Sequence, residues 1–135
     1  MLSRRSVLAF AAFSAIAAVP TQASAEGAYI AVPTYVQQRN EKEAELVCQL
    51  VRQLLMQDHP PSIGVACFNV SQRDLILDCM DRMAAEDPDF AARLTVARNR
   101  IGAGSFDGLF VKNLENVQGD ERDIILLSVC YGYDR

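Results

Sequence analysis

The sequence lacks the short motifs that mark most self-contained nucleotide-dependent and hydrolytic enzymes. It has no G-x-x-x-x-G-K-[ST] loop, since the segment beginning at Gly102 has no lysine to complete one, and no G-x-G-x-x-G follows a strand. It has no serine in a nucleophile elbow. The single histidine, His59, lies beside two prolines in a polar turn and is better explained as a solvated loop residue than as a base. Local motifs therefore offer little support for an enzyme.

The cysteines also lack the pattern of a metal site. Cys48, Cys67, Cys79 and Cys130 form no C-x-x-C pair, whereas zinc sites favour closely spaced ligands. All four lie in apolar segments, where a reduced cysteine behaves as a small hydrophobic residue. We expect buried thiols and no metal, with one disulfide as the alternative, because export would permit it.

An excess of positive charge is missing as well. The chain carries 13 basic and 17 acidic residues, a net charge of −4, and 50% of its residues are hydrophobic. Without residues 1–25, which hold Arg4 and Arg5 and no acid, the other 110 residues have 11 basic and 17 acidic side chains. A domain this acidic argues against a free-standing nucleic-acid binder, although a local groove could still bind one.

Residues 1–25 have the organisation of an export leader. The uncharged run Val7–Val19 is 13 residues long, too short to cross a bilayer as a helix but suited to a signal-peptide core. Ala23–Ala25 supplies the small residues of a cleavage site before Glu26. Ser3–Leu8 resembles a twin-arginine motif, with Val7 in place of the usual Phe. We expect a leader and no stable membrane span; the alternative is a buried N-terminal helix.

Residues 26–135 alternate between amphipathic helices and short apolar runs. One helix is expected to begin at Asn40, with Glu43 completing a capping box. A second is expected to be capped by Ser71, and a third to have Pro88 in its first turn. The expected inward-facing residues are Ala44, Val47, Leu50, Val51 and Leu54 in the first, Ile76, Cys79, Met80 and Met83 in the second, and Phe90, Leu94 and Ala97 in the third.

Four strands are expected between and around these helices. They are Tyr29–Val32, Ile63–Phe68, Leu109–Val111 and Ile124–Val129, and Ile101–Gly108, with three glycines, is expected to be a loop. Two of the runs are continuously apolar, as in strands buried on both faces. Strands that alternate with helices predict a three-layer α/β fold with a mostly parallel sheet.

The segment Phe110–Tyr131 places many polar residues between two buried strands. In parallel sheets, ligands bind where loops and helix N-termini follow the carboxyl ends of strands. Gln118 and Gly119 allow a sharp turn and a close approach of the backbone to a ligand, and Glu121 could accept hydrogen bonds from sugar hydroxyls. Composition alone equally allows a solvated connecting loop.

A family resemblance favours the ligand site. VKNLENVQGDERDIILLSVCYG resembles motif V and the following strand of superfamily 1B DNA/RNA helicases. SIGVACFNVSQRDLILDCM is similar to the motif IV strand and helix, and RNEKEAELVCQLVRQLL to the helix before it. The resemblance covers residues 27–135 and implies that residues 26–135 are a partial second RecA-like domain, the C-terminal motor domain of such helicases.

The resemblance also implies roles for six residues. Gln118, Gly119 and Glu121 would face the nucleotide, with Glu121 near its ribose. Asn69, Gln72 and Asn113 would lie toward DNA or RNA. ATP and Mg²⁺ are implied as cofactors only within a complete helicase.

The sequence departs from the family in two ways. It contains neither the phosphate-binding lysine of the first RecA-like domain nor the motif with the arginine finger, so we expect a truncated domain, inactive alone. A separate ATP-binding domain, or self-association through an uncovered sheet edge, would then be its partner. The leader predicts the periplasm and the helicase resemblance predicts the cytoplasm. The alternative function is an exported periplasmic α/β binding module without helicase activity.

Overall fold

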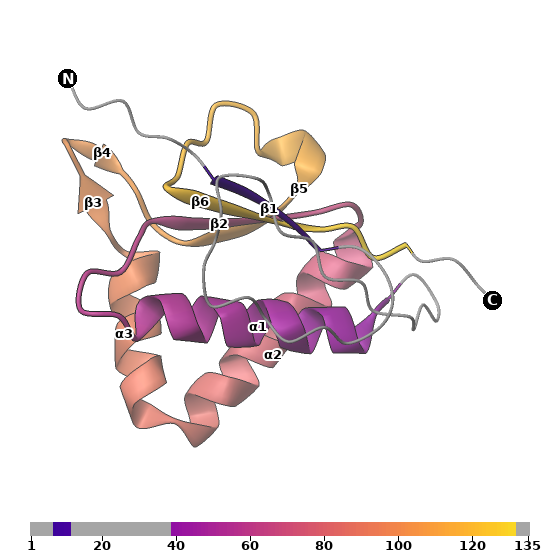
Figure 1. Ribbon diagram of the computed structural model, residues 1–135, viewed down its shortest axis with the longest axis horizontal. Coiled ribbons are helices and arrows are strands. Elements are labelled where there is room, and N and C mark those ends of the chain that lie inside the picture. Colours follow the sequence, from indigo (N-terminus) through magenta and orange to yellow (C-terminus); the bar gives the residue numbers. More distant parts are fainter. Residues whose placement is uncertain (1–6, 12–38, 132–135) are drawn as a thin grey trace.

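The computed structural model describes the backbone of residues 7–11 and residues 39–131 (Figure 1). The predicted strand Tyr29–Val32 and most of the predicted leader lie outside these residues. The elements are β1 (Val7–Ala11), α1 (Glu41–Leu55), β2 (Ile63–Cys67), α2 (Val70–Glu86), α3 (Pro88–Arg98), β3 (Ile101–Gly102), β4 (Ser105–Phe106), β5 (Phe110–Asn113), the 3₁₀ turn η1 (Leu114–Asn116) and β6 (Ile124–Ser128). None of the described helices is long and apolar enough to cross a membrane.

The main sheet is parallel, with strand order β1-β6-β2-β5. In the register of β2, Ile63 lies beside Ile124 of β6 and Cys67 lies beside Asn113 of β5. Every residue of β2 is buried, as the continuous apolar run predicted for a central strand. The predicted α/β fold with a mostly parallel sheet, consistent with a partial RecA-like domain, is confirmed.

The helices α1, α2 and α3 lie on the same face of this sheet (Figure 1). The core between them contains the residues that the helical spacing predicted, among them Val47, Ile76, Met80, Phe90 and Leu94, together with Ile63, Val65 and Leu126 from the sheet. The four cysteines are buried and none of them is in a disulfide, so the prediction of core thiols is confirmed.

Two details of helix capping differ from the sequence prediction. Asn40 caps α1 by accepting a hydrogen bond from the Glu43 N–H, as predicted, but the Glu43 side chain does not return to Asn40. The Asn40 N–H donates instead to Gln72 Oε1. The N-cap of α2 is Asn69 and not Ser71, because the Asn69 side chain accepts from the Gln72 N–H at 2.8 Å. Pro88 occupies the first turn of α3, as predicted.

The segment predicted as a loop, 101–108, contains a short hairpin. Strands β3 and β4 pair antiparallel, joined by Ala103 at φ 48° and Gly104 at φ 83°. Two consecutive positive φ angles are those of a type I′ turn, which matches the twist of a two-residue hairpin. Gly104, which allows this turn, is one of the three glycines from which the sequence predicted a loop.

The face of the sheet opposite the helices is crossed by the connection from β5 to β6 (Figure 1). Gly64 points to this face, because side chains alternate along a strand and its neighbours Ile63 and Val65 belong to the helix-side core. A Cβ on Gly64 would lie 2.3 Å from Cζ of the Phe110 ring, so only glycine leaves room for this ring.

Candidate functional site

Polar residues gather at the carboxyl edge of the sheet, where α1 and α2 begin. Asn69 follows β2, Asn113 ends β5 and Cys130 follows β6. This is the edge at which parallel sheets bind ligands. The structure therefore brings together the three residues that the helicase resemblance assigned to nucleic acid: Asn69, Gln72 and Asn113.

Gln72 is completely buried, and both the oxygen and the nitrogen of its side-chain amide form hydrogen bonds with the backbone of Asn40. Its Oε1 accepts from the Asn40 N–H at 2.8 Å, and its Nε2 donates to the Asn40 carbonyl at 3.0 Å. The Cys130 thiol also donates to Oε1 at 3.5 Å. This contact ties the start of α1 to the first turn of α2, so the amide of Gln72 holds the edge together from inside.

Asn113 differs from Gln72 in that its side-chain oxygen has no partner. The residue is 7% exposed, and its Oδ1 is buried without a hydrogen bond within the described part of the chain. Asn113 precedes η1 but makes no side-chain cap to it. A buried carbonyl oxygen without a donor carries a free-energy cost of about 1–3 kcal/mol, which a ligand N–H or O–H at this edge would relieve.

Glu43 is a buried acid that the sequence prediction placed in a capping box. Its Oε1 accepts from the hydroxyl of Ser128 and, at 3.0 Å, from the N–H of Cys130. Burial raises the pKa of this carboxyl, although hydrogen bonds from Ser128 and from the backbone of Cys130 oppose the shift. The sequence separation of these residues hides the contact, and the one signal was Ser128 as a polar residue inside the apolar run IILLSV.

The two thiols at this edge are protonated at neutral pH. Burial, together with the nearby Glu43 carboxylate, raises the pKa of Cys67 to about 12. Burial also raises the pKa of Cys130, whereas the side chain of Asn69 favours its thiolate. A thiol with a raised pKa is a poor nucleophile, so these cysteines act as packing residues and weak donors.

The residues assigned to the nucleotide, Gln118, Gly119 and Glu121, lie on the connection between β5 and β6. All three are exposed. Gly119 has a φ of 84°, which makes glycine the favoured residue at this turn. Within the described part of the chain, no hydrogen bond or ion pair joins these residues to Asn69, Gln72 or Asn113.

This connection is anchored on both sides of the three residues. The Lys112 ammonium lies 2.7 Å from the Asp120 carboxylate and 5.1 Å from the centre of the Phe110 ring. Arg122 is 4% exposed and donates from Nε to the Gly108 carbonyl at 2.9 Å and from Nη1 to the Glu121 carbonyl at 2.7 Å. Gln118 and Glu121 are thus presented on a loop whose base is fixed.

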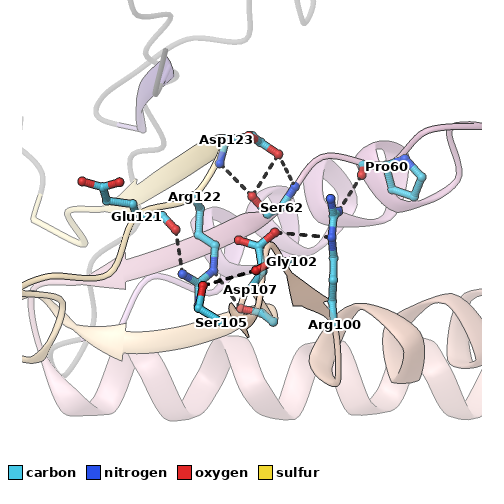
Figure 2. A network of polar contacts seen from close by, with 10 residues as sticks. Pro60, Ser62, Arg100, Gly102, Ser105, Asp107, Glu121, Arg122 and Asp123 are labelled. Carbon is cyan, nitrogen blue, oxygen red and sulfur yellow. Dashed lines mark hydrogen bonds and ion pairs between the residues drawn. The ribbon is translucent and has the colours of Figure 1, made fainter. Parts of the chain in front are cut away.

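The end of the connection is held at the amino edge of the sheet (Figure 2). Asp123 Oδ2 accepts from both the N–H and the hydroxyl of Ser62 at 2.9 Å, and Ser62 Oγ accepts from the Asp123 N–H. The Ile124 N–H then donates to the Ser62 carbonyl at 3.0 Å. These bonds set the start of β6 beside β2.

A separate cavity lies away from this edge. It has a volume of about 950 Å³ and lies between the end of α1, α3 and the start of β2, with His59, Arg93 and Arg100 in its lining. Its two arginines are engaged: Arg93 donates to the Leu55 and Gln57 carbonyls, and Arg100 to the Pro60 carbonyl. It contains none of the six predicted residues. No group of three or more His, Cys, Asp or Glu among the described residues could hold a metal ion.

Two curated proteins resemble this chain closely. It is 45% identical over 98 residues to the uncharacterized ATP-dependent helicase MG140 of Mycoplasma genitalium, and 46% identical over 99 residues to its homolog in Mycoplasma pneumoniae. Each match covers 72% of this chain and 8% of the relative, so the chain corresponds to a small part of those proteins. No solved structure matches it significantly.

The family comparison covers nearly the whole chain. The AAA domain family, AAA_12, matches residues 10–132, which include every described helix, the strands from β2 to β6, the end of β1 and all six predicted site residues. With its parallel sheet and the loop between β5 and β6, the chain belongs to the AAA domain family.

Proposed function

We propose that this chain is a fragment of an ATP-dependent helicase of superfamily 1B, corresponding to its second RecA-like domain. The relatives named as ATP-dependent helicases support a helicase. The observation that carries the proposal is the anchored loop between β5 and β6, because its sequence is the motif V-like string and it exposes Gln118, Gly119 and Glu121 together.

In this proposal the loop contacts ATP. Glu121 accepts hydrogen bonds from the ribose hydroxyls, and Gly119 lets the backbone approach the nucleotide. Mg²⁺ would accompany the ATP and would be held with residues of a separate ATP-binding domain. Because these 135 residues contain no phosphate-binding lysine motif, we expect no ATP turnover by this chain alone.

The carboxyl edge contacts the nucleic acid in the same proposal. Asn69 and Asn113 stand where β2 and β5 end, and the unpartnered Oδ1 of Asn113 can accept from a base or from a ribose hydroxyl. Gln72 acts indirectly, since its buried amide positions Asn40 and the first turn of α2. The acidic net charge of −4 predicts weak binding that depends on this local site.

NMR titrations of the ¹⁵N-labelled chain test both the proposed contact with ATP and the proposed contact with nucleic acid. ATP with Mg²⁺ is expected to shift the amide signals of 118–121, and a single-stranded oligonucleotide those of Asn69 and Asn113. Glu121→Gln should weaken the first effect and Asn113→Ala the second, whereas the exposed neighbour Glu115→Ala should change neither. Shifts confined to other regions for both ligands would contradict the proposal, and ATP turnover by the chain alone would contradict the expected inactivity.

A further inference from the structure

One edge of β6 pairs with β2, and its other edge pairs with the backbone of Val7–Ala11 (Figure 1). The β1–β6 pairing is parallel over five positions, from Val7 beside Ile124 to Ala11 beside Ser128. These residues belong to the run from which the sequence predicted the core of an export leader. The outer edge of β6 is therefore occupied by a segment of the same chain.

We propose that the outer edge of β6 is a strand-acceptor site, and that Val7–Ala11 is retained there as a strand of the folded domain and is not removed as the core of an export leader. Two observations support this. The pairing continues without interruption along the whole of β6. The AAA domain family match begins at residue 10, inside β1 and well before the predicted cleavage point at Glu26.

The register identifies the groups that make the contact. The Ile124 N–H points to β2, where it donates to the Ser62 carbonyl, and successive N–H groups of a strand point to opposite sides. The N–H groups of Ile125 and Leu127 therefore point to β1. In a parallel ladder, a residue bonds to the two residues that flank its register partner. Since Leu8 is the partner of Ile125, the N–H of Ala9 faces β6 and that of Leu8 faces away.

This arrangement makes sheet completion and export of the segment mutually exclusive. A signal-peptide core must leave the domain to be recognised, whereas β1 must stay paired to β6 for the sheet to have four strands. A chain cut before Glu26 would lose β1 and expose the N–H and C=O groups of β6. Open edges of this kind pair with other strands, so such a chain would associate through β6.

Two proline variants of the full chain distinguish this pairing from an unpaired leader. Ala9→Pro removes an N–H that faces β6, and the neighbouring Leu8→Pro removes one that faces away. Hydrogen exchange at the amides of Ile125 and Leu127 is the measurement. Ala9→Pro should raise exchange at these two amides about tenfold or more relative to wild type, and Leu8→Pro should leave it nearly unchanged.

Two results would overturn the proposal. One is rapid exchange of the Ile125 and Leu127 amides in the wild-type chain, as for unprotected backbone, which needs no variant and so remains decisive if a variant fails to fold. The other is an equal effect of both prolines. In sedimentation experiments, Ala9→Pro should also associate more with concentration than Leu8→Pro does, because it weakens the pairing that covers the edge of β6.

Discussion

The guanidinium carbon of Arg122 lies 4.9 Å from the centre of the Phe110 ring, on the face of the sheet that the helices leave free. It also lies 5.8 Å from the Phe106 ring. Arg122 thereby joins the connection before β6 to β5 and to the hairpin β3–β4. Together with the Lys112–Asp120 ion pair, this side chain fixes the loop that carries Gln118, Gly119 and Glu121 against the rest of the domain.

Replacing Arg122 by alanine should destabilise the domain. The change removes the ring contacts and leaves the Gly108 carbonyl without its donor, so we expect a loss of about 2–4 kcal/mol in the free energy of unfolding. Arg122→Lys should recover only part of it, because lysine lacks the planar fork. Urea unfolding measures both, with the exposed Arg82→Ala as the control. A loss equal to that of the control would show that the contacts contribute little.

Adding a methyl group at Gly64 should also destabilise the protein. The new Cβ would lie 2.3 Å from the Phe110 ring and 2.9 Å from Ile125 Cδ1, so the ring must move. We expect Gly64→Ala to cost about 1–3 kcal/mol. Phe110→Leu should relieve part of this cost in the double variant, and a double-mutant cycle on unfolding free energies measures the coupling. If the free-energy changes of the two single variants simply add in the double variant, the predicted clash between residue 64 and the Phe110 ring is contradicted.

Loss of the Gln72 amide should separate the starts of α1 and α2. Gln72→Ala leaves the buried N–H and C=O of Asn40 without that partner, which predicts a destabilisation of about 2–4 kcal/mol. The exposed Gln53→Ala in α1 is the matched control and should change stability by less than about 0.5 kcal/mol. Thermal unfolding compares them. Similar unfolding midpoints for the two variants would show that the hydrogen bonds between Gln72 and Asn40 contribute little to stability.

Glu43 should make stability depend on pH. Burial raises its pKa in the folded protein above the ordinary value of 4.5, so the folded state binds its proton more tightly than the unfolded state does. Its contribution is therefore greatest below pH about 4.5 and is lost as the pH rises through the raised folded pKa. The difference in unfolding free energy, Glu43→Gln minus wild type, should rise with pH across that window. A difference that stays flat would show that the carboxyl is not perturbed.

The local elements were predictable because neighbouring residues determine them. The helical spacing of Val47 and Val51, the prolines after His59 and the apolar run at Ile63 report burial and chain breaks directly. One error occurred where a distant partner competes for a local group. Glu43 bonds to Ser128 and not to Asn40, because a contact between elements outweighed the local pattern. The cap of α2 at Asn69 instead of Ser71 is a local error of two residues, since the Asn69 side chain accepts from the Gln72 N–H.

The candidate site was predictable only as two sets of residues. The motif-like strings pointed to Gln118, Gly119 and Glu121, and to Asn69, Gln72 and Asn113. They could not show that Gln72 is buried or that Asn113 Oδ1 has no partner, because both depend on side-chain packing between β2, β5 and the helix starts. Both residues are buried, and their hydrogen bonds distinguish them: the Gln72 amide is bonded to Asn40, whereas Asn113 Oδ1 has no partner within the described residues.

By itself, the sequence determined the α/β class, the order of the helices and main-sheet strands after residue 40 and the apolar faces that form the core. Periodicity encodes these properties, since each needs only the alternation of polar and apolar residues along one element. The tertiary structure decided the strand order, the role of Glu43 and the position of Val7–Ala11 beside β6. An apolar run is compatible with a leader, a helix or a strand, and only the backbone groups that it meets in the fold distinguish these outcomes.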